Sequence, residues 1–243
     1  MNKNEDFIIE DGVLKQYIGN EKSVIIPDTV KIIGKYAFCR CASVESIKVI
    51  LGVEKVDSCA FNECTNLKKI EISKSLTCIN IPSFSECENL TDIIVDNEND
   101  YYLSENGVLY TKDKKTLVYY PNGKKESQFS VPNGVTTIGK CAFMGCKLKS
   151  IKLPNSITTI SHISFAHSES IEKIEIQNGV TLIEDHAFAN CPKITSVELP
   201  SSVTNIGKLV FFCCQGLKTI KIPKNCLCED NWNLDCKAEI EYY

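Results

Sequence analysis

This sequence of 243 residues contains fourteen cysteines. A cysteine side chain can form a disulfide, bind a metal ion or act as a nucleophile, so these residues are the first candidates for chemistry. Six of them recur at one position of a repeated segment: Cys41, Cys64, Cys87, Cys146, Cys191 and Cys214. In a stack of such segments, neighbouring cysteines would lie about 5 Å apart, which permits a disulfide. Ser168 takes this position in another segment. Because free cysteine is often buried, we favour buried structural thiols, which suit a reducing compartment.

Two smaller groups contain possible metal ligands. Cys226, Cys228 and Cys236 offer three thiols, but the C-x-C spacing differs from that of zinc sites and a fourth ligand is missing. His162, Asp185 and His186 fall on adjacent repeats, where solvated polar residues are the simpler interpretation. We therefore expect no metal and no cofactor. Zinc- or thiol-dependent activity of the C-terminal cysteines is the enzymatic alternative.

No catalytic signature accompanies these residues. The sequence lacks G-x-S-x-G, a P-loop and H-E-x-x-H, so we predict a protein that is not an enzyme. The formal net charge of −4 argues against nucleic acid as a partner. No apolar run approaches the ~18 residues of a membrane span, and no secretory leader follows Met1. As written, the chain is expected in the cytoplasm, or at the cell surface if an upstream signal was removed.

A repeat of about 23 residues organises most of the sequence. Seven of the ten phenylalanines are spaced by 23, 23, 59, 22, 23 and 23 residues: Phe38, Phe61, Phe84, Phe143, Phe165, Phe188 and Phe211. Each is followed by an aliphatic residue, and most then by an alternating I-x-I segment. Such alternation predicts a short strand with its first and third residues inward. The β-branched V-T-x-I segment predicts a second strand, and A-F-x-x-C predicts a short helical or 3-10 turn that buries the phenylalanine.

This period and pattern are typical of a leucine-rich-repeat solenoid, which is a β-rich fold of short parallel strands. The segment 96–128 interrupts it with N-G-V-L-Y, a K-D-K-K turn and T-L-V-Y-Y, which predict an inserted β-hairpin. A shorter echo lies near the N-terminus. We predict one continuous domain with these parts: an N-terminal cap or hairpin (1–22), a first repeat block (23–95), the hairpin module (96–128), a second repeat block (129–223) and a C-terminal cap (224–243).

The repeat also resembles a known family. The strings VTTIGKCAFMGC and VTLIEDHAFANC are similar to the BspA-type, or Treponema pallidum type, leucine-rich repeat, and the resemblance covers roughly residues 23–223. It implies a right-handed β-solenoid of bacterial or protist origin, frequently surface-exposed and in some members an adhesin for host matrix proteins. It implies no catalytic residue.

Two surfaces are candidates for binding. The outward column of the strands has mixed charge, which a solvated face also explains: Lys48, Glu71, Ile94, Lys152, Glu175, Glu198 and Lys221. The hairpin module combines tyrosines with lysines, and the alternative is that the tyrosines cover the break in the solenoid: Tyr101, Tyr102, Tyr110, Lys112, Tyr119 and Tyr120. We predict a scaffold for an unknown protein partner, preferably monomeric, with a matrix-binding adhesin fragment as the alternative.

Overall fold

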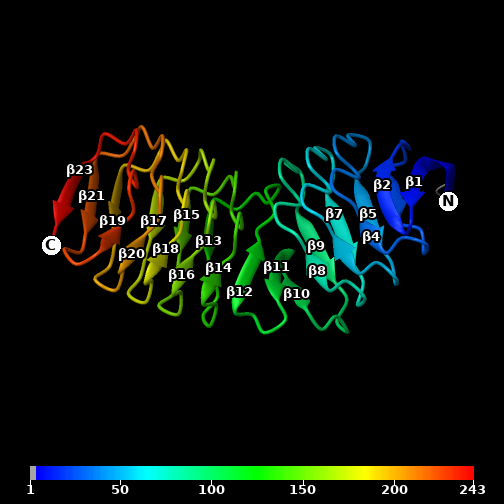
Figure 1. Ribbon diagram of the computed structural model, residues 1–243, viewed down its shortest axis with the longest axis horizontal. Coiled ribbons are helices and arrows are strands. Elements are labelled where there is room, and N and C mark those ends of the chain that lie inside the picture. Colours follow the sequence, from blue (N-terminus) through cyan, green and yellow to red (C-terminus); the bar gives the residue numbers. More distant parts are fainter. Residues whose placement is uncertain (1–3) are drawn as a thin grey trace. The chain divides into compact units, whose positions relative to one another are not determined.

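The computed structural model describes residues 4–243, which divide into two compact units (Figure 1). The N-terminal unit comprises Met1–Asp113 and Pro121–Lys124, and the C-terminal unit comprises Lys114–Tyr120 and Lys125–Tyr243. Each unit is a β-solenoid in which every turn of the chain contributes strands to parallel stacks. The predicted fold class is thereby confirmed, whereas a single continuous domain stays a prediction. Of the predicted cap at 1–22, residues 1–3 lie outside the described residues.

The repeats of the N-terminal unit form two sheets. The first is parallel and pairs the I-x-I segments in register: β3 (Ser23–Ile25), β5 (Ser46–Val49), β7 (Lys69–Ile72) and β9 (Asp92–Val95). The second begins with an antiparallel hairpin and continues in parallel: β1 (Phe7–Glu10), β2 (Val13–Tyr17), β4 (Ile32–Ile33), β6 (Lys55–Val56) and β8 (Cys78–Ile79). The predicted N-terminal hairpin is therefore present.

The C-terminal unit repeats this arrangement. Its stack of short strands is β12 (Thr116–Tyr119), β14 (Thr137–Ile138), β16 (Thr159–Ile160), β18 (Leu182–Ile183), β20 (Asn205–Ile206) and β22 (Leu227–Cys228). The I-x-I segments form two groups: β13 (Gln128–Ser130), β15 (Ser150–Lys152) and β17 (Lys173–Glu175), then β19 (Ser196–Glu198), β21 (Thr219–Ile222) and β23 (Glu239–Tyr242).

The A-F-x-x-C segments are turns and not the helical or 3-10 elements expected from sequence. In the first repeat, Tyr36 and Arg40 have φ of 62° and 61°, so a left-handed residue recurs on each side of Phe38. A right-handed helix cannot continue through such residues. The amide of Phe38 instead donates to the carbonyl of Ala60 in the next repeat (2.8 Å). In residues 4–243 the only helix is the 3-10 helix η1 (Asn4–Asp6).

The core of each unit is a column of stacked aromatic rings. The seven repeat phenylalanines are all buried, and neighbouring ring centroids lie 5.5 Å apart at Phe61 and Phe84 and 5.1 Å apart at Phe143 and Phe165. Tyr17 begins the column in the N-terminal unit and Tyr120 begins it in the C-terminal unit. Offset ring contacts at these distances add to the free energy gained by burying the rings.

The inserted module contains a hairpin, whereas the C-terminus differs in part from prediction. β10 (Tyr102–Glu105) and β11 (Val108–Thr111) form an antiparallel hairpin whose turn, Asn106-Gly107, has φ of 50° and 78°. The next strand, β12, pairs in parallel with β14. The segment 224–243, expected to leave the pattern, adds another solenoid turn, with Trp232 against Phe211 at 6.1 Å between ring centroids.

Candidate protein-binding surface

The outward face of the β3–β5–β7–β9 sheet carries two exposed isoleucines. Ile25, Lys48, Glu71 and Ile94 lie side by side in register on adjacent strands. Ile25 is 52% exposed and Ile94 is 45% exposed, although the alternate residues of the same strands are buried. Strand pleating explains why neighbouring residues face opposite ways. The isoleucine at each end of the row therefore leaves about half of its surface in contact with water.

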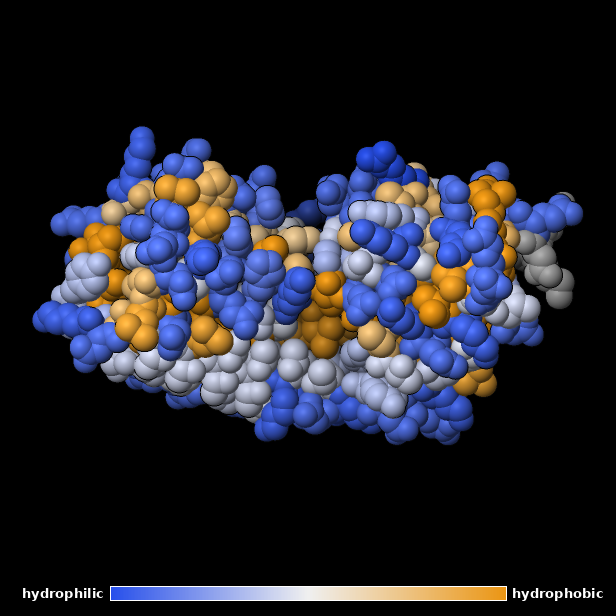
Figure 2. Space-filling model, in the orientation of Figure 1, coloured by the Kyte–Doolittle hydropathy of each residue, from blue (hydrophilic) through white to orange (hydrophobic). Residues whose placement is uncertain are grey.

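A groove lies at the carboxyl ends of these strands. Its volume is about 590 Å³, and its lining includes Asp28, Lys48, Leu51, Glu71, Ile94 and Asp96. Leu51 follows β5 in the turn and is 58% exposed. Figure 2 shows hydrophobic surface among charged groups in the part of the view that contains β5, β7 and β9. The groove thus combines apolar side chains with carboxylates, which is a composition suited to a protein partner.

The charges on the strands are largely balanced within the face. Glu71 accepts an ion pair from Lys69 at 2.6 Å and from Lys48 at 3.9 Å. Asp28 and Asp96, which lie after β3 and β9, form no ion pair within the described residues. Asp96 only accepts the backbone amide of Glu98 (2.9 Å). Lys74, which pairs with Glu98, also lies near enough to Asp96 for this carboxylate to contribute to raising the pKa of Lys74. Asp28 and Asp96 are therefore carboxylates of the groove without a direct ion pair in residues 4–243.

The corresponding face of the C-terminal unit is polar. Lys152 and Glu175 are paired in register, and the carboxylate of Glu175 lies 2.8 Å from the ammonium of Lys173, which lowers the pKa of Glu175. Glu198 is in register with Lys221 on the next strand. No isoleucine or leucine is exposed in this outward column of the described chain. The predicted column residues are thus brought together within each unit. Only the N-terminal column contains exposed isoleucines, whereas Tyr243, which is 48% exposed, lines a groove of the C-terminal face.

The tyrosines of the hairpin module mostly point inward. Tyr110, Tyr119 and Tyr120 are buried, whereas Tyr101 is 52% exposed. Tyr102 is half-buried, and its hydroxyl oxygen accepts a hydrogen bond from the amide of Ile79 (3.0 Å). Burial therefore favours the packing interpretation for the three buried rings over a role in recognition. Lys112 remains exposed at the hairpin, where its ammonium donates to the carbonyl of Asn97 (3.0 Å).

The cysteine ladder, defined as the six repeat cysteines, makes a regular hydrogen bond. Thiols donate to the carbonyl of the phenylalanine one repeat earlier: Cys64 to Phe38 (3.0 Å), Cys87 to Phe61 (3.0 Å), Cys191 to Phe165 (3.2 Å) and Cys214 to Phe188 (3.0 Å). Ser168 makes the same bond to Phe143 (2.9 Å). A small donor is required here, which explains why serine replaces cysteine. All fourteen cysteines are free thiols.

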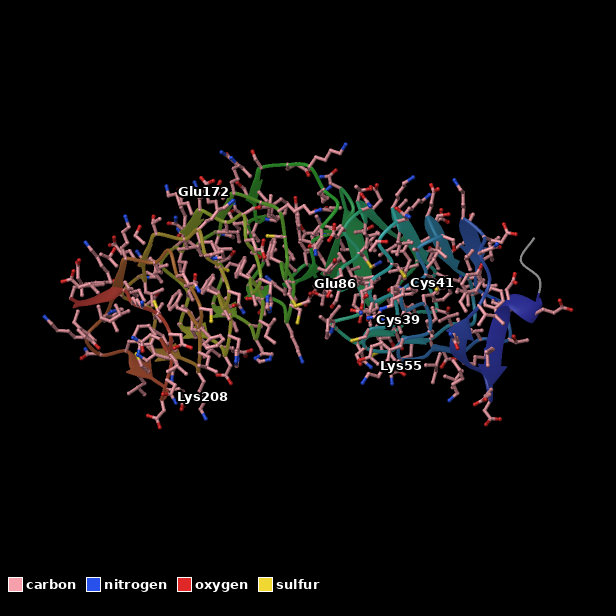
Figure 3. All side chains as sticks on the ribbon, turned by 90° about the horizontal axis from the view of Figure 1, so that it is seen from above. Cys39, Cys41, Lys55, Glu86, Glu172 and Lys208 are labelled. Atoms are coloured by element: carbon pink, nitrogen blue, oxygen red, sulfur yellow. The ribbon has the colours of Figure 1, made fainter. Side chains whose placement is uncertain are left out.

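Burial keeps these thiols protonated. It raises the pKa of Cys41 to about 12 and, with a contribution from the neighbouring Cys236 thiol, that of Cys214 to about 12. Figure 3 shows Cys41 beside Cys39 in the N-terminal unit. A thiol is nucleophilic as the thiolate, so raised pKa values oppose reactivity. The ladder is consequently a packing feature that also satisfies backbone carbonyls.

Neither candidate metal group assembles into a site. Cys236 lies 22 residues after Cys214 and continues the ladder, while burial raises the pKa of Cys226 to about 12. The rings of His162 and His186 are 5.7 Å apart and nearly perpendicular. Within residues 4–243, no three histidine, cysteine, aspartate or glutamate side chains are arranged to hold a metal ion.

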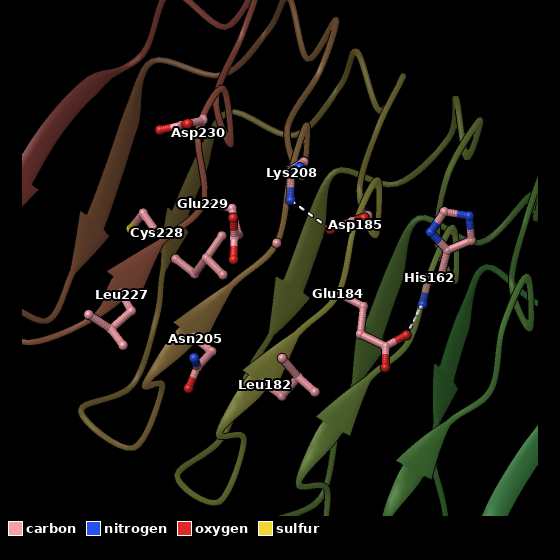
Figure 4. A pocket seen from close by; sticks show the side chains of 12 residues that line it. His162, Leu182, Glu184, Asp185, Asn205, Lys208, Leu227, Cys228, Glu229 and Asp230 are labelled. Carbon is pink, nitrogen blue, oxygen red and sulfur yellow. Dashed lines mark hydrogen bonds between the residues drawn. The ribbon is translucent and has the colours of Figure 1, made fainter.

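A second groove, of about 600 Å³, crosses the short strands of the C-terminal unit (Figure 4). Its carboxylates include Glu184, Asp185, Glu229 and Asp230. Glu184 accepts the backbone amide of His162 (2.8 Å), and Asp185 accepts that of Lys208 (2.7 Å). These two carboxylates therefore connect adjacent turns of the solenoid. Their presence in the groove is explained by this structural role.

Sequence reasoning missed Asp28, Leu51 and Asp96. A signal was present for Leu51, because the equivalent turn position holds polar residues elsewhere: Asp28, Lys74, Asn155, Asn178, Ser201 and Lys224. A leucine in a turn otherwise occupied by aspartate, asparagine, serine or lysine departs from turn chemistry. The groove around it could not be foreseen without the register of the strands.

These stacked turns define a β-solenoid of the leucine-rich-repeat class. The family model for the BspA type leucine rich repeat region matches six copies over residues 8–118 and 118–236. The chain belongs to this family. No match was found among the curated protein sequences compared with it.

Solved structures with a similar fold come from bacteria. A leucine-rich repeat protein from Eubacterium ventriosum is 22% identical with a TM-score of 0.72, covering 95% of this chain and 78% of its own. The pneumococcal vaccine antigen PcpA is 22% identical with a TM-score of 0.69, covering 91% and 68%. A leucine rich cell surface protein from Faecalibacterium prausnitzii is 23% identical with a TM-score of 0.63, covering 97% and 92%. At these identities the likeness establishes the fold. The described residues contain no helix that could cross a membrane.

Proposed function

We propose that this protein is a non-enzymatic scaffold that binds a protein partner through the outward face of β3, β5, β7 and β9. The observation that carries the proposal is the exposure of Leu51 and Ile94 beside a groove. Both residues occupy repeat positions at which the C-terminal unit has polar residues. The leucine-rich-repeat class favours an interaction scaffold, because stacked repeats create extended surfaces for binding.

Site-specific photocrosslinking tests this surface without a known partner. A benzophenone amino acid replaces Leu51 in one variant and the equivalent Asn178 in a matched control. We expect Leu51 to yield discrete crosslinked proteins that Asn178 does not yield, and we expect Ile94→Lys to remove them. Identical crosslinks from both positions, or crosslinks that survive Ile94→Lys in a folded protein, would reject the surface.

Binding at a cell surface is the second candidate. Two proteins of similar structure are described as a cell surface protein and a vaccine antigen, and this supports an adhesin role for the same face. In that case the intact chain should bind immobilised matrix proteins, and Ile94→Lys should reduce binding while Lys152→Glu should not. Equal binding by the two variants would contradict this role for the N-terminal face.

A further inference from the structure

We propose that the groove on the N-terminal unit recognises an extended segment in which two basic residues flank an apolar residue on one face, with the pattern basic-x-apolar-x-basic. The inference deepens the proposed function and depends on it. It follows from three features of the groove, namely its exposed apolar side chains, its two carboxylates without a direct ion pair in the described residues, and the separation of these carboxylates.

The exposed side chains of Leu51 and Ile94 supply an apolar contact in the groove. Leu51 is 58% exposed and Ile94 is 45% exposed, and the buried Val49 and Ile72 also line the groove. Covering Leu51 and Ile94 with another apolar side chain would remove their surface from water, which is the main favourable contribution in protein association. A wholly polar segment would leave this surface exposed and gain nothing from it.

The carboxylates determine the sign of the partner's charge. Glu71 is already balanced by Lys69 and Lys48, whereas Asp28 and Asp96 have no ion pair in the described chain. An acidic segment would therefore face two like charges that have no direct ion pair among the described residues. Lysine or arginine would instead form new pairs while its methylene groups lie along the apolar surface.

The spacing of the carboxylates sets the spacing of the basic residues. Asp28 follows β3 and Asp96 follows β9, and these strands are three intervals apart in the order β3-β5-β7-β9. At a strand spacing of about 4.8 Å, the interval is on the order of 14 Å. In an extended segment, residues i, i+2 and i+4 share a face, and i and i+4 are about 13 Å apart. Basic residues at i and i+4 therefore match Asp28 and Asp96, with the apolar residue i+2 over β5 and β7, between Leu51 and Ile94.

Fluorescence anisotropy with labelled synthetic peptides tests this pattern on the full chain at low ionic strength. The probe is Thr-Lys-Thr-Leu-Thr-Lys-Thr. One comparison peptide has glutamate in place of both lysines, and another has the same composition with the lysines adjacent. We expect the probe to bind several-fold more tightly than either comparison peptide, because only the probe combines the charge sign with the spacing.

Variants of the protein assign the binding to the groove. Asp28→Asn with Asp96→Asn should weaken probe binding roughly three- to tenfold, as expected for two exposed ion pairs. The matched control, Glu229→Gln with Asp230→Asn in the C-terminal unit, removes equal charge and should leave binding unchanged. This control separates groove binding from attraction to the net negative charge of the chain.

The outcomes distinguish the inference from the proposed function. Equal affinity for the acidic and basic peptides, or equal weakening by the groove and control variants, overturns the inference. If Leu51 still crosslinks a partner in that event, the proposed surface stands with a partner of different chemistry. Absence of any Leu51-dependent crosslink would reject the surface itself. Circular dichroism of each variant verifies that it is folded.

Discussion

The outward faces of the two units differ although their inward faces are alike. In both units the inward residues of these strands are apolar, nearly all aliphatic with Phe129 the aromatic member, and the aromatic column is continuous within the unit. Outward, the N-terminal unit has Ile25 and Ile94, whereas the C-terminal unit has residues such as Lys152 and Glu175. Folding constrains the inward half of each repeat because those side chains contact the adjacent turns. The outward half is free to vary, so departures there are the best indication of function.

The largest expected effect tests whether the two cores are equivalent. Phe61→Ala and Phe165→Ala each remove a fully buried ring between two stacked neighbours. We expect each to lower the free energy of unfolding by about 3–5 kcal/mol, measured by urea denaturation followed by circular dichroism. Phe→Leu at the same positions should cost less, because it leaves a smaller cavity. If the alanine substitution at one position lowered the free energy of unfolding by less than about 1 kcal/mol, the unit that contains it would depend less on its aromatic column than the other unit does.

The inward half of the repeat is what the sequence made predictable. The regular spacing of Phe143 and its equivalents identified the core, and the I-x-I alternation identified the strands. The left-handed conformations of Tyr36 and Arg40 had no signal, because neither residue type favours them. Trp232 was missed because it replaces the phenylalanine with a different ring at a shifted spacing. The carboxylates of the groove, Asp28 and Asp96, are far apart in the sequence. They lie on the same surface only because of the register of the strands.

An intermediate effect on stability is expected from removing the serine hydroxyl that takes the place of the cysteine thiol in one repeat. Ser168 is buried and its hydroxyl donates to the carbonyl of Phe143 (2.9 Å). Ser168→Ala leaves this carbonyl without its side-chain donor and should lower the free energy of unfolding by about 1–3 kcal/mol.

Ser168→Cys is the matched control, because it restores the donor that Cys191 supplies to Phe165 in the next repeat (3.2 Å). Thermal and urea unfolding of both variants measure the difference. If Ser168→Ala and Ser168→Cys were equally stable, the ladder would be a matter of side-chain volume and its hydrogen bond would contribute nothing.

The smallest effect on stability is expected from exchanging outward residues between the units. Leu51→Asn and Ile94→Lys give the N-terminal face the residue types found at Asn178 and Lys152, and Glu175→Ile makes the reverse change in the C-terminal unit. These side chains contact solvent, so each free energy of unfolding should change by no more than about 0.5 kcal/mol. Urea midpoints measure this, and a loss above 1 kcal/mol at Leu51 would mean that the leucine stabilises its turn. Substitutions in the inward half of the repeat should therefore change stability, and substitutions in the outward half should change binding. An outward side chain that the fold does not require is available to contact a partner, because it can vary at no cost to folding.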